Sequence, residues 1–153
     1  MVRRSFAAIL MLLLAACTAG GIPVSTGGGG GITIDVNLTL NSPTNTQYGL
    51  SAGYSPHVTT VAVGSQIKFV NTDSFTHTAT LIPNATSFPG GSPFTDKALT
   101  QQGGTLSGGF TSGALLAGFS SQTISVDRAG TYFFGCFFHY SEPANMRGVL
   151  VAQ

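Results

Sequence analysis

Four residues of this chain have the types and the spacing of metal ligands. Cys136, His139 and Met146 lie within one eleven-residue stretch near the C-terminus, and His77 lies far upstream. A thiolate, two imidazoles and a thioether suit a copper ion that cycles between Cu(II) and Cu(I), because sulfur favours the reduced ion and imidazole accepts both states. The pattern therefore predicts one mononuclear copper site with an electron-transfer role.

Sulfur-containing residues are scarce in the chain, which strengthens this interpretation. The methionines are Met1, Met11 and Met146, and the cysteines are Cys17 and Cys136. Once the N-terminal segment is set aside, one residue of each type remains, and both fall in the same short stretch. This clustering favours a shared site.

The N-terminal segment has the features of a bacterial lipoprotein signal peptide. Residues 1–16 hold a basic start, a short apolar run and small residues before a cut. Residues 14–17 resemble a lipobox, in which the cysteine after the cut receives lipid. We therefore expect Cys17 to be lipidated, with an ordinary secretory signal peptide as the alternative.

Lipidation would place the protein in the cell envelope, anchored to a membrane on its periplasmic or extracellular face. Thr18 after the cysteine favours the outer membrane where the cell has one. A lipidated Cys17 would also leave Cys136 without a disulfide partner. A bound metal would explain an unpaired thiol in an oxidising compartment, because the metal occupies the thiolate.

The composition bounds the domain organisation and the partners. Residues 17–31 read as the lipidated cysteine and a Gly-rich tether, and residues 32–153 read as one domain. Charged residues make up 7% of the chain and the net charge is +1, so we expect no nucleic-acid partner. No apolar helix of transmembrane length is predicted after the signal, so the lipid would be the only membrane anchor.

The domain is predicted to be all-β. Short β-branched or aromatic runs alternate with polar residues and are separated by turn-forming residues, which favours a sandwich or barrel. The predicted strands span residues 32–40, 58–63, 66–71, 77–82, 119–126, 130–136 and 147–152. Residues 83–118 are rich in Gly, Ser, Thr and Pro, and they are predicted to form a long excursion over one face with a helical turn near residues 96–101.

The predicted strand before the cysteine places that residue in a core. Side chains alternate along a strand, so Tyr132, Phe134 and Cys136 share one face and Phe133 lies on the other. His139 and Met146 then fall on the following loop, where they can bend back toward the thiol.

Residues 130–139 and 146–151 resemble the cupredoxins, particularly those of the plastocyanin and amicyanin type. Residues 69–78 look like the segment that carries the first histidine ligand of that family, and residues 112–118 also resemble it. The resemblance implies an eight-stranded, cupredoxin-like Greek-key β-sandwich. It implies a type 1 copper site with His77, Cys136 and His139 as equatorial ligands and Met146 as the weak axial ligand.

The same resemblance identifies further residues near the predicted site. Six residues separate His139 from Met146, more than in plastocyanin-like proteins, so Glu142 in this loop is an alternative axial ligand. Asn71 and Thr78 are candidates to support the site by hydrogen bonds to the cysteine loop, or else ordinary turn and strand residues. His57 has no ligand-type neighbour and is predicted to be a surface residue.

The resulting prediction is a monomeric electron carrier, not an enzyme. It would meet a redox protein donor and a redox protein acceptor transiently through an apolar patch around His139, to which Phe138, Tyr140 and Pro143 could contribute. A copper-delivery protein of the cell envelope is the alternative, although such proteins usually expose Met- or His-rich tracts. Copper oxidases require more histidines than this chain has, and a structural zinc site is also compatible with the ligand types.

Overall fold

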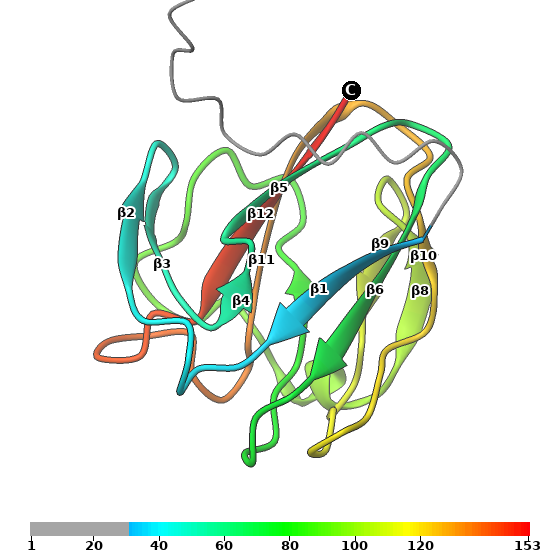
Figure 1. Ribbon diagram of the computed structural model, residues 1–153. Coiled ribbons are helices and arrows are strands. Elements are labelled where there is room, and N and C mark those ends of the chain that lie inside the picture. Colours follow the sequence, from blue (N-terminus) through cyan, green and yellow to red (C-terminus); the bar gives the residue numbers. More distant parts are fainter. Residues whose placement is uncertain (1–30) are drawn as a thin grey trace, which may run out of the picture.

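The computed structural model describes residues 31–153, so the signal peptide, Cys17 and the rest of the tether up to residue 30 lie outside the described residues. The described part consists of short strands and one 3₁₀ turn, η1 (Figure 1). Their bounds are β1 Ile32–Val36, β2 Thr44–Thr46, β3 Gly49–Ser51, β4 Tyr54–Ser55, β5 Val58–Val61, β6 Gln66–Asn71, β7 Thr80–Leu81, η1 Asp96–Leu99, β8 Gln102–Thr105, β9 Gly109–Thr111, β10 Ile124–Ser125, β11 Gly130–Gly135 and β12 Arg147–Ala152. None of the helices in the described range is long and apolar enough to cross a membrane.

One ten-stranded sheet curls into a barrel-like sandwich. Its strand order is β4-β1-β6-β10-β8-β9-β7-β11-β12-β5, and β2 and β3 form a separate hairpin. The two edge strands of the sheet, β4 and β5, are consecutive in the chain and are joined only by Pro56 and His57. Because two residues span only a short distance, the two edges of the sheet must come together. A backbone hydrogen bond from Arg147 to Ala52 fastens the same region.

The core lies between the two halves of the curled sheet. Alternation along β11 and into the next residue places Phe134 and Cys136 in the main buried cluster, as predicted, and places Phe133 in a second cluster on the opposite face. Four aromatic rings fill the centre of the main cluster. Their centroids lie 4.7 Å apart for Tyr54 and Phe134, 5.2 Å for Phe69 and Phe134, and 5.7 Å for Phe69 and Phe110.

Several predicted strands are shorter in the structure. The strand predicted over residues 32–40 ends at Val36, because the chain turns where the side chain of Asn37 accepts a hydrogen bond from the Leu40 amide. The strands predicted over residues 77–82 and 119–126 are shortened to β7 and β10. The periodicity of the sequence identifies these segments correctly, but it predicts longer strands than the structure has.

The prediction for residues 83–118 is wrong in part. The predicted helical turn is present as η1, but β8 and β9 are strands of the main sheet rather than parts of an excursion. Glycine allows their close pairing: Gly103 has φ +70°, and a Cβ there would lie 2.1 Å from the carbonyl oxygen of Gly109. A Gly-rich strand carries little hydrophobic signal, which explains why the pattern conceals it.

Phe134 provides a test of the core. We expect Phe134→Ala to lower the free energy of unfolding by about 3–5 kcal/mol, because it leaves a cavity among three aromatic rings. Phe119→Ala is the matched control, since Phe119 is 62% exposed, and it should change stability by no more than about 0.5 kcal/mol. Chemical denaturation of the metal-free protein measures both, and equal effects would contradict the described core.

Candidate metal centre

Three loops that follow β6, β9 and β11 gather at one end of the sandwich, the lower end in Figure 1. The antiparallel pairing of β7 with β11 aligns Thr80 with Gly135 and Leu81 with Phe134. When the same strand pairing is continued by one or two residues beyond β7 and β11, the segment after His77 lies alongside Cys136. The sheet therefore brings together residues that are about 60 positions apart in the sequence.

The predicted strong ligands form a compact cluster. The ligand atoms of His77, Cys136 and His139 all lie within 4.8 Å of one another. The Cys136 Sγ atom is 3.8 Å from Nδ1 of His77 and 3.6 Å from Nδ1 of His139, and the two Nδ1 atoms are 3.2 Å apart. His77 and Cys136 are fully buried, whereas His139 is half-buried. Two nitrogen atoms and one sulfur atom thus face a common point.

His77 is held at both its backbone and its ring. Its amide donates to the carbonyl of Leu115 and its carbonyl accepts from the amide of Leu115, at 3.1 and 2.8 Å. On the side of the ring away from Cys136, Nε2 lies 3.1 Å from Oδ2 of Asp73. Sequence reasoning missed Asp73, for which the only signal is an acidic residue four positions before the histidine.

Hydrogen bonds hold Cys136 in place at both its sulfur atom and its backbone amide. The Thr78 amide donates to Sγ at 3.4 Å, and the Cys136 amide donates to the carbonyl of Met146 at 3.1 Å. The Thr78 hydroxyl accepts a hydrogen bond from the Phe137 amide at 2.8 Å. Thr78 therefore makes the link to the cysteine loop that the sequence predicts for it.

Asn71 supports a different part of the centre. Its Nδ2 donates to the carbonyls of Phe75 and Leu115, at 2.7 and 2.8 Å, and its Oδ1 accepts from the Asp73 amide. These bonds join the end of β6 to the loops on both sides of His77, but none of them reaches the cysteine loop. Its role is to brace the backbone that carries the first histidine.

Burial controls the protonation of the metal-free cluster. It raises the pKa of the Cys136 thiol, against the lowering effect of nearby backbone amides. It lowers the pKa of His77, although Asp73 acts in the opposite direction, and it lowers the pKa of His139, where the nearby His77 further disfavours a second positive charge. Near neutral pH the imidazoles are therefore neutral and ready to bind, and metal uptake must displace the thiol proton.

Met146 is fully buried in the same cluster of side chains as Cys136, while Glu142 is exposed on the loop. The Met146 amide donates to the carbonyl of His139 at 2.9 Å, which closes the loop between the two residues. Its side chain packs against Gly53, where an added Cβ would lie 3.0 Å from the Met146 sulfur. Burial favours Met146 over Glu142, and its ligation of a metal stays a prediction.

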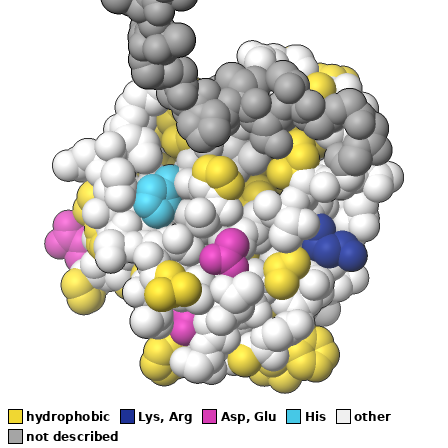
Figure 2. Space-filling model, viewed as in Figure 1, with side chains coloured by type: hydrophobic (Ala, Val, Ile, Leu, Met, Phe, Trp, Pro, Cys, Tyr) yellow, Lys and Arg dark blue, Asp and Glu magenta, His cyan; other side chains and the backbone are white. Residues whose placement is uncertain are grey.

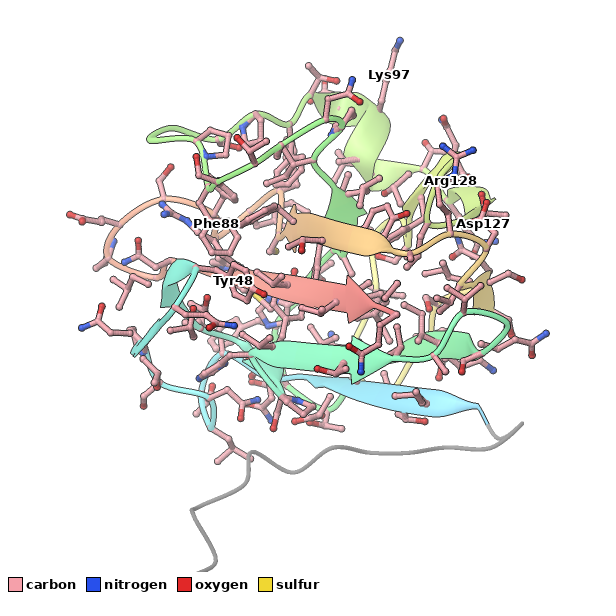
Figure 3. All side chains as sticks on the ribbon, turned by 90° about the horizontal axis from the view of Figure 1, so that it is seen from above. Tyr48, Phe88, Lys97, Asp127 and Arg128 are labelled. Carbon is pink, nitrogen blue, oxygen red and sulfur yellow. The ribbon has the colours of Figure 1, made fainter. Side chains whose placement is uncertain are left out.

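The loop between His139 and Met146 is tied to the residues that precede η1. The Tyr140 hydroxyl donates to the carbonyl of Pro89 at 3.1 Å, and the Arg147 guanidinium lies 4.4 Å from the centre of the Tyr140 ring. Phe88 packs nearby, on the same side of the molecule as Tyr48 in Figure 3, and both rings contact Phe133 edge-on.

One prediction about the neighbouring residues needs correction. Tyr140 is buried and does not contribute to an exposed patch, whereas Phe138 and Pro143 are exposed as predicted. His57 is partly exposed at the surface, and its Nδ1 donates to the carbonyl of Tyr54 at 2.7 Å. It takes no part in the cluster of ligand atoms.

The donor set fits copper. A buried thiol sulfur and two imidazole nitrogens, with a thioether buried in the same core, combine soft and intermediate ligands in a site that excludes most water. His77, Cys136 and His139 could therefore hold a single copper ion, as the sequence predicts.

Of the comparisons with known proteins, the one with solved structures bears on the fold. No family model matches the chain, and no curated protein matches it. Among solved structures, a Cu(I) amicyanin variant is 14% identical, with 81% of this chain and 83% of that chain covered and a TM-score of 0.50. A reduced amicyanin variant is 15% identical, with 85% and 89% covered and a TM-score of 0.50.

A purple cupredoxin from Nitrosopumilus maritimus is also similar, with 21% identity, 80% of this chain and 99% of that chain covered and a TM-score of 0.48. The amicyanin structures show that this chain has the cupredoxin fold. The predicted all-β, cupredoxin-like class is therefore confirmed, but the predicted number of eight strands is wrong for the described residues, which form twelve short strands.

Gly135 provides a test of the loop packing. A Cβ at this position would lie 2.6 Å from the Tyr140 ring, so Gly135→Ala should displace the ring and lower the free energy of unfolding by about 1–3 kcal/mol. Gly90→Ala is the control, because a Cβ there meets nothing within 4 Å, and it should be nearly neutral. Thermal denaturation compares the two variants, and an equally neutral Gly135→Ala would mean that Tyr140 does not cover Gly135.

Proposed function

We propose that this protein transfers single electrons by means of a mononuclear type 1 copper centre. The observation that carries the proposal is the buried convergence of the Cys136 sulfur and the two Nδ1 atoms within 4.8 Å. Copper bound by His77, Cys136 and His139 would supply a one-electron couple, and Met146 would add the weak axial bond. The protein would keep these donors in one arrangement in both oxidation states, through the hydrogen bonds described above.

The position of His139 supports an exchange of electrons at the surface. It is the half-buried member of the cluster, and the neighbouring Phe138 side chain is 45% exposed with its ring centroid 6.1 Å from that of His139. A ligand whose edge approaches the surface gives a partner a short route to the metal. His77 and Cys136 lie deeper and offer no such route.

The surface around this end is apolar. Five of the six large hydrophobic side chains that are exposed among residues 31–153 lie on its loops: Leu40, Phe75, Leu116, Phe119 and Phe138. In the face seen in Figure 2, yellow side chains are prominent at the lower end, with a magenta Asp or Glu side chain among them, and the dark blue Lys or Arg side chain lies on the right side. Such a surface suits brief contacts with a redox donor and a redox acceptor.

The location of the protein belongs to the same proposal. A lipid on Cys17 would hold the domain at a membrane of the cell envelope. A copper-delivery role gains no support from any particular residue, because the described range holds a single methionine, Met146, and it is buried.

The first test of this function is spectroscopic. Purified protein mixed with Cu(II) should bind one equivalent and show an intense visible band from the thiolate–copper bond, which ascorbate bleaches. Cys136→Ser should abolish the band, because it removes the sulfur donor, while His57→Ala should leave it unchanged. Tight zinc uptake without any such band from Cu(II) would identify a structural zinc site and remove the electron-transfer proposal.

A second test separates the axial candidates. Met146→Leu should keep the colour and raise the reduction potential, because loss of the thioether leaves a more apolar site that favours Cu(I). Glu142→Gln should do little, since Glu142 faces water. Cyclic voltammetry with electron paramagnetic resonance compares the variants, and the opposite ranking would assign the axial position to Glu142.

A further inference from the structure

Asp73 is a buried carboxylate that contacts the predicted ligand His77 on the side of its ring away from Cys136. It is 4% exposed, and its Oδ2 lies 3.1 Å from Nε2 of His77, the ring nitrogen that faces away from Cys136. The same oxygen accepts hydrogen bonds from the amides of Leu38 and Thr39, at 2.8 and 3.2 Å. A carboxylate that is buried and surrounded by this number of hydrogen-bond donors is a specific feature of the fold.

The second oxygen of Asp73 is equally occupied. Its Oδ1 accepts from the Ser74 amide at 2.7 Å and from the Thr39 hydroxyl at 3.1 Å. The Asp73 amide donates to Oδ1 of Asn71 at 2.9 Å, which fixes the backbone as well. The carboxylate therefore cannot rotate away from His77 without breaking contacts to the loop after β1 and to the neighbouring Ser74.

These contacts make both oxygens of the carboxylate acceptors. Backbone amides and a hydroxyl, from Leu38, Thr39 and Ser74, already donate to them. An acceptor oxygen facing Nε2 of His77 requires that this nitrogen carry the proton. The lone pair of His77 is then on Nδ1, the atom that faces Cys136 and His139.

We propose that Asp73 is a positioning residue that fixes His77 as the Nε2–H tautomer before any metal arrives and, when copper is bound, favours Cu(II) over Cu(I). The first effect is geometric, because the Asp73–His77 hydrogen bond sets the ring orientation. The second is electrostatic, since a negative charge shared with the imidazole stabilises the more positive ion. Only the second effect rests on the proposed electron-transfer function.

The geometric effect is tested on the metal-free protein without any substitution. Two-dimensional proton–nitrogen spectra of the histidine rings should show His77 as the Nε2–H tautomer, with a ring proton that exchanges slowly with water. His57 is the internal comparison, because its Nδ1 donates to the carbonyl of Tyr54 and it should show the opposite tautomer. A His77 ring found in the Nδ1–H form, or averaging between both forms, would overturn the proposal.

The electrostatic effect is tested with a pair of matched variants. Asp73→Asn and Asp35→Asn each remove one carboxylate charge at the same end of the fold, but Asp35 bonds to Thr72 and Asn41 and to no ligand. We expect Asp73→Asn to weaken the binding of Cu(II) relative to that of Cu(I) by about tenfold, which corresponds to a rise in reduction potential of about 59 mV. We expect Asp35→Asn to change the potential much less. Equal shifts in the two variants would overturn the electrostatic part.

Zinc affinity distinguishes this proposal from the proposed function. Zn²⁺ binds the same thiolate and imidazoles without redox chemistry, so Asp73→Asn should weaken zinc by about 10–100-fold even if the protein proves not to be an electron carrier. Unchanged zinc affinity in Asp73→Asn, with Cys136→Ser as the control for loss of binding, would show that Asp73 does not hold His77 for the metal.

Discussion

Thr78 joins the two segments that carry the buried ligands, and the centre depends on this one residue. Its amide donates to the Cys136 sulfur, its hydroxyl accepts from the amide of Phe137, and its carbonyl accepts a hydrogen bond from the Tyr54 hydroxyl at 2.5 Å. All of its polar groups are therefore used within the fold. Because Tyr54 also packs at the centre of the aromatic core, the position of the thiol is coupled to core packing rather than to the flexibility of a loop.

The clustering of the three candidate ligands could be predicted from the sequence because their chemistry is local. A cysteine and a histidine three residues apart, with a strand of alternating aromatics before them, specify which side chain faces the core. His77 followed from a resemblance to a known segment, and Thr78 from its place beside His77. In each case the residue type and its immediate neighbours held the information.

Asp73 and the strands β8 and β9 could not be predicted in this way. The partners of Asp73 include residues of the loop after β1, which are 34 and 35 positions away, and no local pattern indicates that a loop will fold over the carboxylate. The strands β8 and β9 consist largely of Gly, Gln and Thr, so they lack the apolar alternation by which a strand is detected. Both features arise from contacts between distant segments.

Tyr140 makes the ligand loop inseparable from another part of the chain. Its ring covers Gly135, its hydroxyl reaches Pro89, and Arg147 stacks on it from the first position of β12. A shorter loop from a copper protein of the same fold would therefore bring ligands but leave Gly135 and Phe94 without their contacts to Tyr140. In evolution or in engineering, the length of this loop and the residues that precede η1 must therefore change together. The loop between His139 and Met146 cannot be replaced on its own.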